Sequence, residues 1–500
     1  MSKSVYIPLG GGIDLTSPPR QMAPGSAFYA VNYECPITGG YRRIAGYTKI
    51  AETLPGSGPV LGVKTFCNNY IAIRGNGDGT ASIYKCPADG HDHADGGTVG
   101  WTLITGGDGT LNEARHEFAE GNFYATDAKH ALYFVGQGKP WELDTEGNLT
   151  ELSNAPSGAH FIAIHMNHLF LGFEPGSLQF SGVGTPNAWG ADTDGAGEIG
   201  VGDTLTGLLS GRGDVLHVGC CNSMKGLYGT SAQNFQMKNT LPGSGCKAYT
   251  LQSMMEPYFC GDRGITNLQA SSKFGDFAPF QAGAKIEPLF SEAGYSCHVV
   301  ASMVSRELAQ YRVFFDDKTG VYYSPTGATT VEFLDRVMVT DSSELKSGEE
   351  VLLFGDDVGN VYRLGNNAES FNGEKIRAFI ATAYTDLKSP DVIKRFRRAF
   401  FDINNTSGTQ IAIKSVLDFG DYKNPNQIRH FANPTERGGL WSINKWGEFA
   451  WSSPIMAIDP VSLAGSGESI NFSIYSDSAS SPHDVFGYTI NYQPRRMRRG

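Results

Sequence analysis

The sequence predicts an all-β protein whose central part is a β-propeller, and three observations lead to this expectation. Glycine accounts for 63 of the 500 residues, and tyrosine and phenylalanine add 22 and 29. Glycine favours tight turns, and aromatic side chains favour the pleated surface of strands. Sustained helical periodicity is missing, because the best helical stretches, 111–118, 299–308 and 390–398, span three turns at most. The third observation is a repeated hairpin.

One unit recurs between residues 56 and 372: a short apolar strand, a polar or glycine turn, and a second strand that is often aromatic. Successive units lie 61, 37, 47, 42, 55 and 39 positions apart, and a four-stranded blade uses roughly 40–50 residues. We therefore expect a propeller over 56–372. Six blades fit best, and the uneven spacing leaves five or seven open. A β-sandwich or several small β-domains are the alternative, because they also contain frequent short strands.

The segments before and after the repeat have a different sequence pattern. Residues 1–55 are expected to form an N-terminal arm and the first strands. Residues 373–500 contain longer strand-like stretches, such as 376–380 and 397–403, and end in a basic tail. We expect a separate C-terminal β-rich platform module there, built together with the N-terminal region, whose final strands could also complete the ring.

Charge and cysteine usage restrict the class of protein. The chain carries 40 Lys+Arg and 51 Asp+Glu, a net charge of −11, which is typical of soluble globular proteins. The first thirty residues lack the continuous apolar core of a secretory signal, and no apolar run approaches the roughly 18 residues of a membrane span. We expect folding in a cytosol, with unpaired thiols and no zinc, since no Cys-x-x-Cys occurs. The eight cysteines are residues 35, 67, 86, 220, 221, 246, 260 and 297.

Two segments have the composition of metal sites. His91-Asp92-His93-Ala94-Asp95 combines two imidazoles with two carboxylates, but it lies in a glycine-rich stretch without distant partner ligands. The acidic segment 192–198 has only half the pattern of a calcium loop and lacks the closing glutamate. A solvated loop is the better interpretation of both, and we expect no cofactor.

Motifs of catalysis are missing as well. The sequence contains neither a Gly-x-Ser-x-Gly elbow nor a Gly-x-x-x-x-Gly-Lys-Ser/Thr loop. The glycine-rich segment 75–79 is explained by a hairpin turn that requires positive φ angles, and Arg212-Gly213-Asp214 by a tight turn. No two carboxylates stand out as a hydrolase pair. The sequence therefore predicts a protein that is not an enzyme.

Clustered basic residues are candidate assembly contacts. They could bind nucleic-acid phosphates, because clustered guanidinium groups release counterions there. The acidity of the whole chain argues against a free-standing nucleic-acid binder and favours pairing with an acidic surface of a neighbouring subunit. The candidates are Arg42, Arg43, Lys394, Arg395, Arg397, Arg398, Arg495, Arg496, Arg498 and Arg499.

The most specific feature is an ordered series near the N-terminus. It consists of Gly11-Gly12-Ile13-Asp14-Leu15, Pro18-Pro19, Ala30-Val31-Asn32-Tyr33 and the segment 39–47, Gly-Gly-Tyr-Arg-Arg-Ile-Ala-Gly-Tyr. This series resembles the opening of the tail nozzle or tail tubular proteins of short-tailed bacteriophages, which include the packaged-DNA stabilisation proteins. Segments 180–189, 199–203 and 487–492 are similar to later parts of the same proteins.

The resemblance implies an architecture and a place of action, but no catalytic residue. It implies a homohexameric ring below the portal and adaptor proteins of a virion tail, with a propeller and a platform, assembled in the host cytoplasm. Tail fibres or a needle would be further partners, and double-stranded DNA would pass through without specific binding. An acidic lumen suits this role because it repels phosphate.

Two other classes of function stay open at this stage. A propeller that binds a receptor or a glycan would need aromatic platforms for stacking, whereas Trp101, Trp141 and Trp189, the only tryptophans of the repeat, are expected to serve core packing. A carbohydrate hydrolase is the other alternative.

Overall fold

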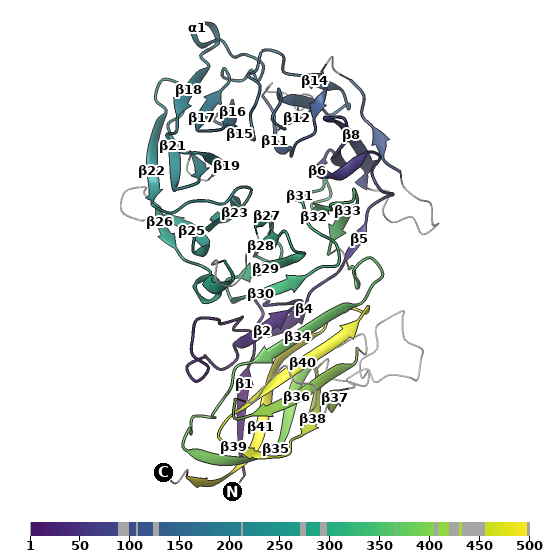
Figure 1. Ribbon diagram of the computed structural model, residues 1–500, viewed down its shortest axis with the longest axis vertical. Coiled ribbons are helices and arrows are strands. Elements are labelled where there is room, and N and C mark those ends of the chain that lie inside the picture. The colour runs from purple at the N-terminus through teal and green to yellow at the C-terminus, as the bar shows by residue number, and fades with distance from the viewer. Residues whose placement is uncertain are drawn as a thin grey trace.

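The computed structural model describes residues 2–88, 100–106, 109–123, 130–211, 214–270, 277–290, 298–365, 367–404, 409–419, 430–432 and 456–497. These residues form a ring-shaped propeller and, beside it, an elongated sandwich of two sheets that contains both ends of the chain (Figure 1). Strands predominate. Two short helices have described bounds, α1 (Ala191–Asp194) and the 3₁₀-helix η3 (Ala284–Leu289).

Seven blades surround the propeller axis within the described residues, each an antiparallel meander that starts at the axis and runs outward (Figure 1). Blade 1 contains β6 (Ser57–Phe66), β7 (Asn69–Gly75), β8 (Thr80–Pro87), β9 (Thr102–Leu103) and β10 (Leu111–Asn112). Blade 2 contains β11 (Glu117–Gly121), β12 (Ala131–Val135), β13 (Trp141–Asp144) and β14 (Leu149–Glu151). Blade 3 contains β15 (Phe161–His165), β16 (His168–Phe173), β17 (Ser177–Phe180) and β18 (Gly197–Gly200).

The remaining blades follow the same plan. Blade 4 contains β19 (Leu205–Ser210), β20 (Val215–Cys220), β21 (Ser223–Tyr228) and β22 (Gln236–Pro242). Blade 5 contains β23 (Gln252–Met254), β24 (Glu256–Gly261), β25 (Gly264–Ala270) and β26 (Phe277–Phe280). Blade 6 contains β27 (Val299–Ser305), β28 (Gln310–Phe315), β29 (Thr319–Ser324) and β30 (Gly327–Glu332). Blade 7 contains β31 (Val339–Glu344), β32 (Glu350–Gly355), β33 (Val361–Leu364) and β5 (Tyr47–Lys49).

The all-β propeller expected from the hairpin repeat is confirmed, and the described sheets place its blade number at seven, the upper end of the expected range. The last blade differs from a sequence repeat because its outer strand, β5, comes from residues before the repeat begins. Tyr47 is paired with Leu364, and Lys49 with Tyr362. The chain's final strands do not complete the ring, a possibility that the sequence left open, because β41 (Asp484–Met497) pairs along β35 (Val392–Asn404).

Packing between blades explains why the ring is closed. Apolar side chains of neighbouring blades share continuous clusters, as where Val60 and Tyr70 of blade 1 meet Val351 and Leu353 of blade 7. A blade has no apolar core of its own and buries its faces only against its neighbours. Contact between blade 7 and blade 1 therefore buries the last pair of blade faces, and β5 completes the outer edge of blade 7.

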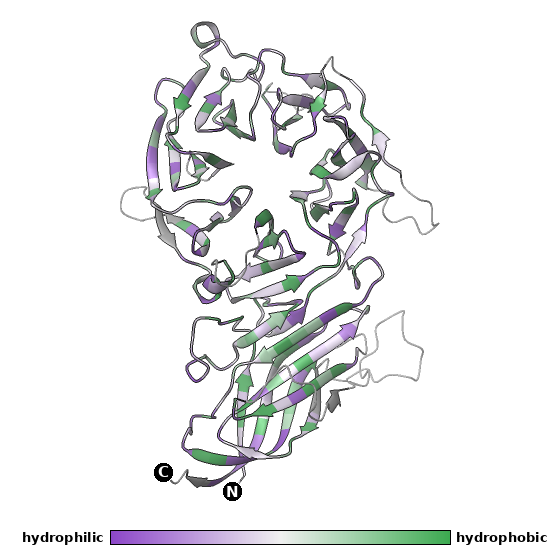
Figure 2. Ribbon diagram, viewed as in Figure 1, coloured by the Kyte–Doolittle hydropathy of each residue, from purple (hydrophilic) through white to green (hydrophobic). Residues whose placement is uncertain are grey.

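Two sheets packed face to face build the sandwich. One is β3 (Tyr33–Glu34), β4 (Tyr41–Arg43), β41, β35 and β38 (Met456–Ser462), with β1 (Lys3–Pro8) on β41 and β39 (Ser466–Gly467) on β35. The other is β2 (Ala27–Val31), β34 (Ile376–Thr382), β40 (Ile470–Ser478), β36 (Ile411–Leu417) and β37 (His430–Ala432). Hydrophobic and hydrophilic residues alternate along these strands (Figure 2), as sheets with one buried face require. Between the sheets, the ring of Phe472 packs 5.1 Å from Phe401 and 4.8 Å from Tyr488.

Strand β2 joins the two parts of the molecule. It pairs antiparallel with β34 and continues blade 6 through a parallel pair between Val31 and Thr330. One sheet therefore runs from blade 6 into the sandwich. Residues 1–55 contribute to both parts, since β1, β3 and β4 lie in the sandwich and β5 lies in the propeller.

Candidate functional site

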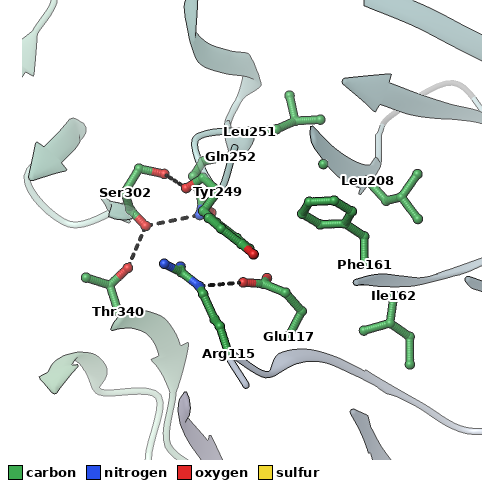
Figure 3. A pocket seen from close by; sticks show the side chains of 11 residues that line it. Arg115, Glu117, Phe161, Ile162, Leu208, Tyr249, Leu251, Gln252, Ser302 and Thr340 are labelled. Carbon is green, nitrogen blue, oxygen red and sulfur yellow. Dashed lines mark hydrogen bonds and ion pairs between the residues drawn. The ribbon is translucent and has the colours of Figure 1, made fainter. Parts of the chain in front are cut away.

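A small cavity on the propeller axis is the first candidate site. Its volume is about 70 Å³, and the side chains that surround it come from the inner ends of six blades (Figure 3). A water molecule needs about 10–15 Å³ of such space. The cavity can therefore hold a few waters and is too small for a sugar ring. Its lining consists of Arg115, Glu117, Phe161, Ile162, Gly207, Leu208, Tyr249, Leu251, Gln252, Ser302 and Thr340.

Arg115 crosses this cavity from blade 2 to the opposite side of the ring. Its Nη1 donates to the carbonyl oxygens of Val300, at 2.6 Å, and Met338, at 3.2 Å, which belong to the inner ends of blades 6 and 7. The guanidinium carbon lies 3.6 Å from the centre of the Tyr249 ring, a cation–π contact with the start of blade 5. One side chain thus ties four blades together at the axis.

Glu117 balances the charge of Arg115. Its Oε1 lies 3.2 Å from Arg115 Nε. Burial raises the pKa of Glu117, and the positive charge of Arg115 opposes this rise. Glu117 is the only acidic residue among the described side chains that line the cavity. A hydrolase of the two-carboxylate type needs a second carboxyl group, so this arrangement closes the axis and has no evident catalytic pair.

Sequence reasoning missed Arg115. The only signal in the sequence is a pair of opposite charges, Arg115 and Glu117, at the start of an inner strand. No rule of residue spacing predicts from this pair that Arg115 would cross the propeller axis. Which groups it meets depends on blades 5, 6 and 7, whose residues lie 130 or more positions later in the chain.

The second candidate site is the joint between propeller and sandwich, which the N-terminal series builds. Asn32 is buried, with a positive φ of 56°. Its Nδ2 donates to the carbonyl oxygens of Glu332, at 3.2 Å, and Arg377, at 2.8 Å, and its Oδ1 accepts from the amide of Glu332 at 2.8 Å. Glu332 ends blade 6 and Arg377 lies on β34. Asn32 therefore fixes the sandwich to the propeller.

Other members of the series pack into the same joint. Gly12 has a φ of 71°, and a Cβ atom there would lie 2.6 Å from the amide nitrogen of Ala328 in β30. Tyr41 is fully buried and donates its hydroxyl to the carbonyl oxygens of Gly12 and Gly25, both at 3.2 Å. Glycine at position 12 is thus required by a close approach of two backbones.

Arg43, one of the candidate assembly residues, is buried inside the chain. Its guanidinium group donates to the carbonyl oxygens of Ser478, Glu369 and Ser480. Next to it, His483 Nε2 lies 2.8 Å from the hydroxyl of Tyr33. Burial, followed by the charge of Arg43, lowers the pKa of His483 to about 3. Carbonyl oxygens of the chain thus hold the guanidinium group of Arg43, whereas Arg43 Nε and His483 Nδ1 are buried without a hydrogen-bond partner.

Lys394 is also buried, and its charge is satisfied by backbone oxygens. Its Nζ donates to the carbonyl oxygens of Ser389, Val392 and Glu468 at 2.6, 3.0 and 2.8 Å. Burial lowers the pKa of Lys394, and Asp386 opposes the shift. In contrast, Arg42 is partly exposed, and its Nε lies 3.9 Å from Asp484 Oδ1.

The other basic candidates lie on or beyond the outer surface of the sandwich. Arg395, Arg397 and Arg398 are exposed on β35, and Arg495 is exposed on β41. The backbone of Arg496 belongs to β41 and pairs with Ile393. The side chain of Arg496 and the whole of residues 498 and 499 lie outside the described part of the chain.

The remaining predicted segments give no further site. Residues 91–95 and 212–213 lie outside the described residues, and Asp214 has a φ of 58°, as a tight turn requires. In the segment 192–198, Asp194 and Glu198 accept hydrogen bonds from Gly190 and Ser177. Among the described residues, no group of three or more His, Cys, Asp or Glu side chains is placed to hold a metal ion.

The described cysteines are free thiols, and residue 297 lies outside the described ranges. Burial raises the pKa of Cys246 and of Cys260 to about 12. Both are therefore protonated at neutral pH, and a protonated thiol is a weak nucleophile. In the described part of the chain, none of the helices has the length and apolar character needed to cross a membrane.

Comparison with solved structures gives distant similarities to other β-propellers. No family model matches the chain, and no curated protein matches it. The WD40 β-propeller domain of Doa1 has a TM-score of 0.41 and 9% identity, over 64% of this chain and 97% of that one. A virginiamycin B lyase from Staphylococcus aureus has a TM-score of 0.41 and 12% identity, over 62% of this chain and 94% of that one. Neither similarity assigns a function.

Proposed function

We propose that this chain is a structural protein of a bacteriophage tail, which assembles as a six-membered ring below the portal and adaptor proteins and conducts and retains the genome without catalytic turnover. The observation that carries this proposal is the role of the N-terminal series. Gly12, Asn32 and Tyr41, which carry the resemblance to tail nozzle proteins, all lie in the joint between propeller and sandwich. The motif is therefore architectural in this chain.

The closed propeller axis supports a conduit between subunits. Arg115 spans the axis from blade 2 to carbonyl oxygens of blades 6 and 7, whereas the major groove of DNA alone is about 12 Å wide. DNA cannot pass through the propeller of a single chain. A ring of identical copies encloses a central hole, because closed cyclic symmetry repeats one interface around an axis.

Charge supports a propeller that faces the lumen. Residues 56–372 carry 19 Lys+Arg against 36 Asp+Glu. A wall with this excess of carboxylates repels phosphate, so that DNA slides past it without sticking. The N-terminal and C-terminal strands of the sandwich then make the contacts with the adaptor, since the blade faces are used by their neighbours.

A glycan-binding propeller is less well supported. Trp141 is buried, and the indole nitrogens of Trp101 and Trp189 donate to the carbonyl oxygens of Glu52 and Pro186. These tryptophans therefore serve packing and hydrogen bonding within the chain. A carbohydrate hydrolase would need a second carboxyl group beside Glu117.

The proposal is tested by the assembly state of the purified chain. Six copies of a 53.9 kDa chain give a particle of about 320 kDa, which mass photometry resolves from a monomer. Addition of the adaptor protein should shift the ring to a larger complex. A monomer that binds oligosaccharides tightly would refute the tail-ring function and favour the glycan-binding propeller.

A further inference from the structure

Charge is divided unevenly between the two parts of the molecule. The propeller region, 56–372, carries 19 Lys+Arg and 36 Asp+Glu, whereas the remaining residues carry 21 and 15. The propeller region is thus strongly acidic, and the rest of the chain, which builds most of the sandwich, is basic. The net charge of −11 conceals this division. A basic surface in an acidic chain indicates an anionic ligand.

The exposed basic side chains gather where the two longest strands pair. We call Arg395, Arg397, Arg398 and Arg495 the arginine face. Strands β35 and β41 run antiparallel for most of their length, and their register shifts between Ile393 and Lys394 and between Phe396 and Arg398.

Each of these two shifts is a β-bulge that leaves one arginine without a pairing partner. Phe396 pairs with Tyr492 and Arg398 pairs with Asn491, so Arg397 is the extra residue on β35. Ile393 pairs with Arg496 and Lys394 with Pro494, so the extra residue on β41 is Arg495. A bulge re-aims its side chain, and here the consecutive residues Arg397 and Arg398 are both exposed. Three exposed arginines thus lie within four consecutive residues of β35.

The described partners of the arginine face are neutral polar residues. Arg397 Nη2 donates to Gln493 Oε1 at 2.9 Å, and the residues paired with Arg398 and Arg395 across the sheet are Ser462 and Ser466. Among the ion pairs of the described residues, none includes a member of the arginine face. Its charge is therefore available to a ligand.

Phosphate fits this surface better than an acidic protein does. None of the described large hydrophobic side chains that are exposed lies on β35 or β41, whereas protein interfaces rely on buried aromatic or aliphatic anchors. Serine and glutamine are also common phosphate contacts.

We propose that the arginine face binds the backbone phosphates of double-stranded DNA without reading its sequence. The acidic propeller and the basic sandwich then divide two tasks, since one repels the genome and the other holds it. The role in genome retention rests on the proposed function, whereas the binding of DNA by this surface requires no ring.

The test is the salt dependence of DNA binding by the full chain. Fluorescence anisotropy of a labelled duplex of about 25 base pairs, with arbitrary sequence, gives the affinity between 50 and 200 mM NaCl. Each phosphate contact contributes about −0.9 to the slope of log K against log salt. The variant Arg395→Gln/Arg397→Gln/Arg398→Gln should therefore reduce the slope by about 2.7. Over this salt range, wild type should lose about 40-fold more affinity than the variant.

A matched control removes the same charge elsewhere. Arg20→Gln/Arg263→Gln/Arg306→Gln replaces three exposed arginines outside β35 and β41, and it should leave the slope unchanged. An equal slope for both variants, or competition by poly-glutamate as strong as that by DNA, would overturn the inference, and the second result would assign an acidic protein as the partner. If the chain is a monomer that binds DNA through the arginine face, the proposed tail ring is refuted and the DNA-binding inference stands. If the chain forms the ring but does not bind DNA, the inference is refuted and the proposed ring stands.

Discussion

Removal of the Tyr47 side chain should destabilise the blade that closes the propeller ring. Tyr47 lies on β5, the strand that completes blade 7, and is fully buried. Its ring stacks on Phe371 at 4.8 Å and meets the edge of Phe354 at 5.1 Å, and its hydroxyl donates to Asp335 Oδ2 at 2.7 Å. Replacement of a buried aromatic residue by alanine costs about 3–5 kcal/mol. A hydrogen bond to a charged group contributes about 1.5–3 kcal/mol.

These magnitudes separate the two functions of the side chain. Tyr47→Phe should lower the free energy of unfolding by about 2 kcal/mol, because only the hydrogen bonds between its hydroxyl and the carboxylate and amide of Asp335 are lost. Tyr47→Ala should lower it by about 5 kcal/mol, because the packing is lost as well. Urea titration followed by circular dichroism measures both values, and the half-exposed Tyr6 serves as control, since Tyr6→Ala should cost less than about 1 kcal/mol. A loss for Tyr47→Ala no larger than that of the control would refute closure of the ring by β5.

Two further predictions concern buried charge. Burial lowers the pKa of His116 and of His217 to about 4 and that of His483 to about 3. The fold therefore has the full stability of its neutral histidines above pH 6.5 and loses it as the pH falls toward those values. Urea titrations should show a decrease in the free energy of unfolding of roughly 2 kcal/mol per histidine at pH 5, and an unchanged free energy between pH 7 and 5 would contradict the prediction. Arg115→Met should lower the free energy of unfolding by about 2 kcal/mol. This is less than the loss of about 3–5 kcal/mol for breaking a fully buried ion pair, because the side chains of Arg115 and Glu117 are 21% and 33% exposed. Arg115→Met/Glu117→Gln should regain more than half of that loss, and additive effects in the double-mutant cycle would show that the pair is not coupled.

The repeat was visible in the sequence because hairpins are local. Each unit places two strands and their turn within about 25 residues, and the turn chemistry follows from the residues themselves. Gly77 and Gly79, between β7 and β8, have φ angles of 84° and 89°, as expected for the glycine-rich segment 75–79. Blade 7 was not visible as a complete unit, because β5 joins it from about 300 positions away.

The sandwich depends on contacts that the sequence pattern does not encode. The stretch 390–398 has weak helical periodicity, yet most of it belongs to β35, since tertiary pairing with β41 overrides local preference. Arg43 and Lys394 have the composition of surface residues, but backbone carbonyls from distant segments surround their charged groups. The bulges that expose Arg397 and Arg495 arise from the register of two strands about 90 residues apart.

Electron microscopy of the purified full chain tests the central claim most directly. Two-dimensional class averages of the assembled particle should show a six-fold ring with an open centre. Its three-dimensional map should place the propellers around the lumen, with Asp and Glu predominating on the inner wall. Particles without six-fold symmetry, or a lumen lined mainly by Lys and Arg, would contradict the account.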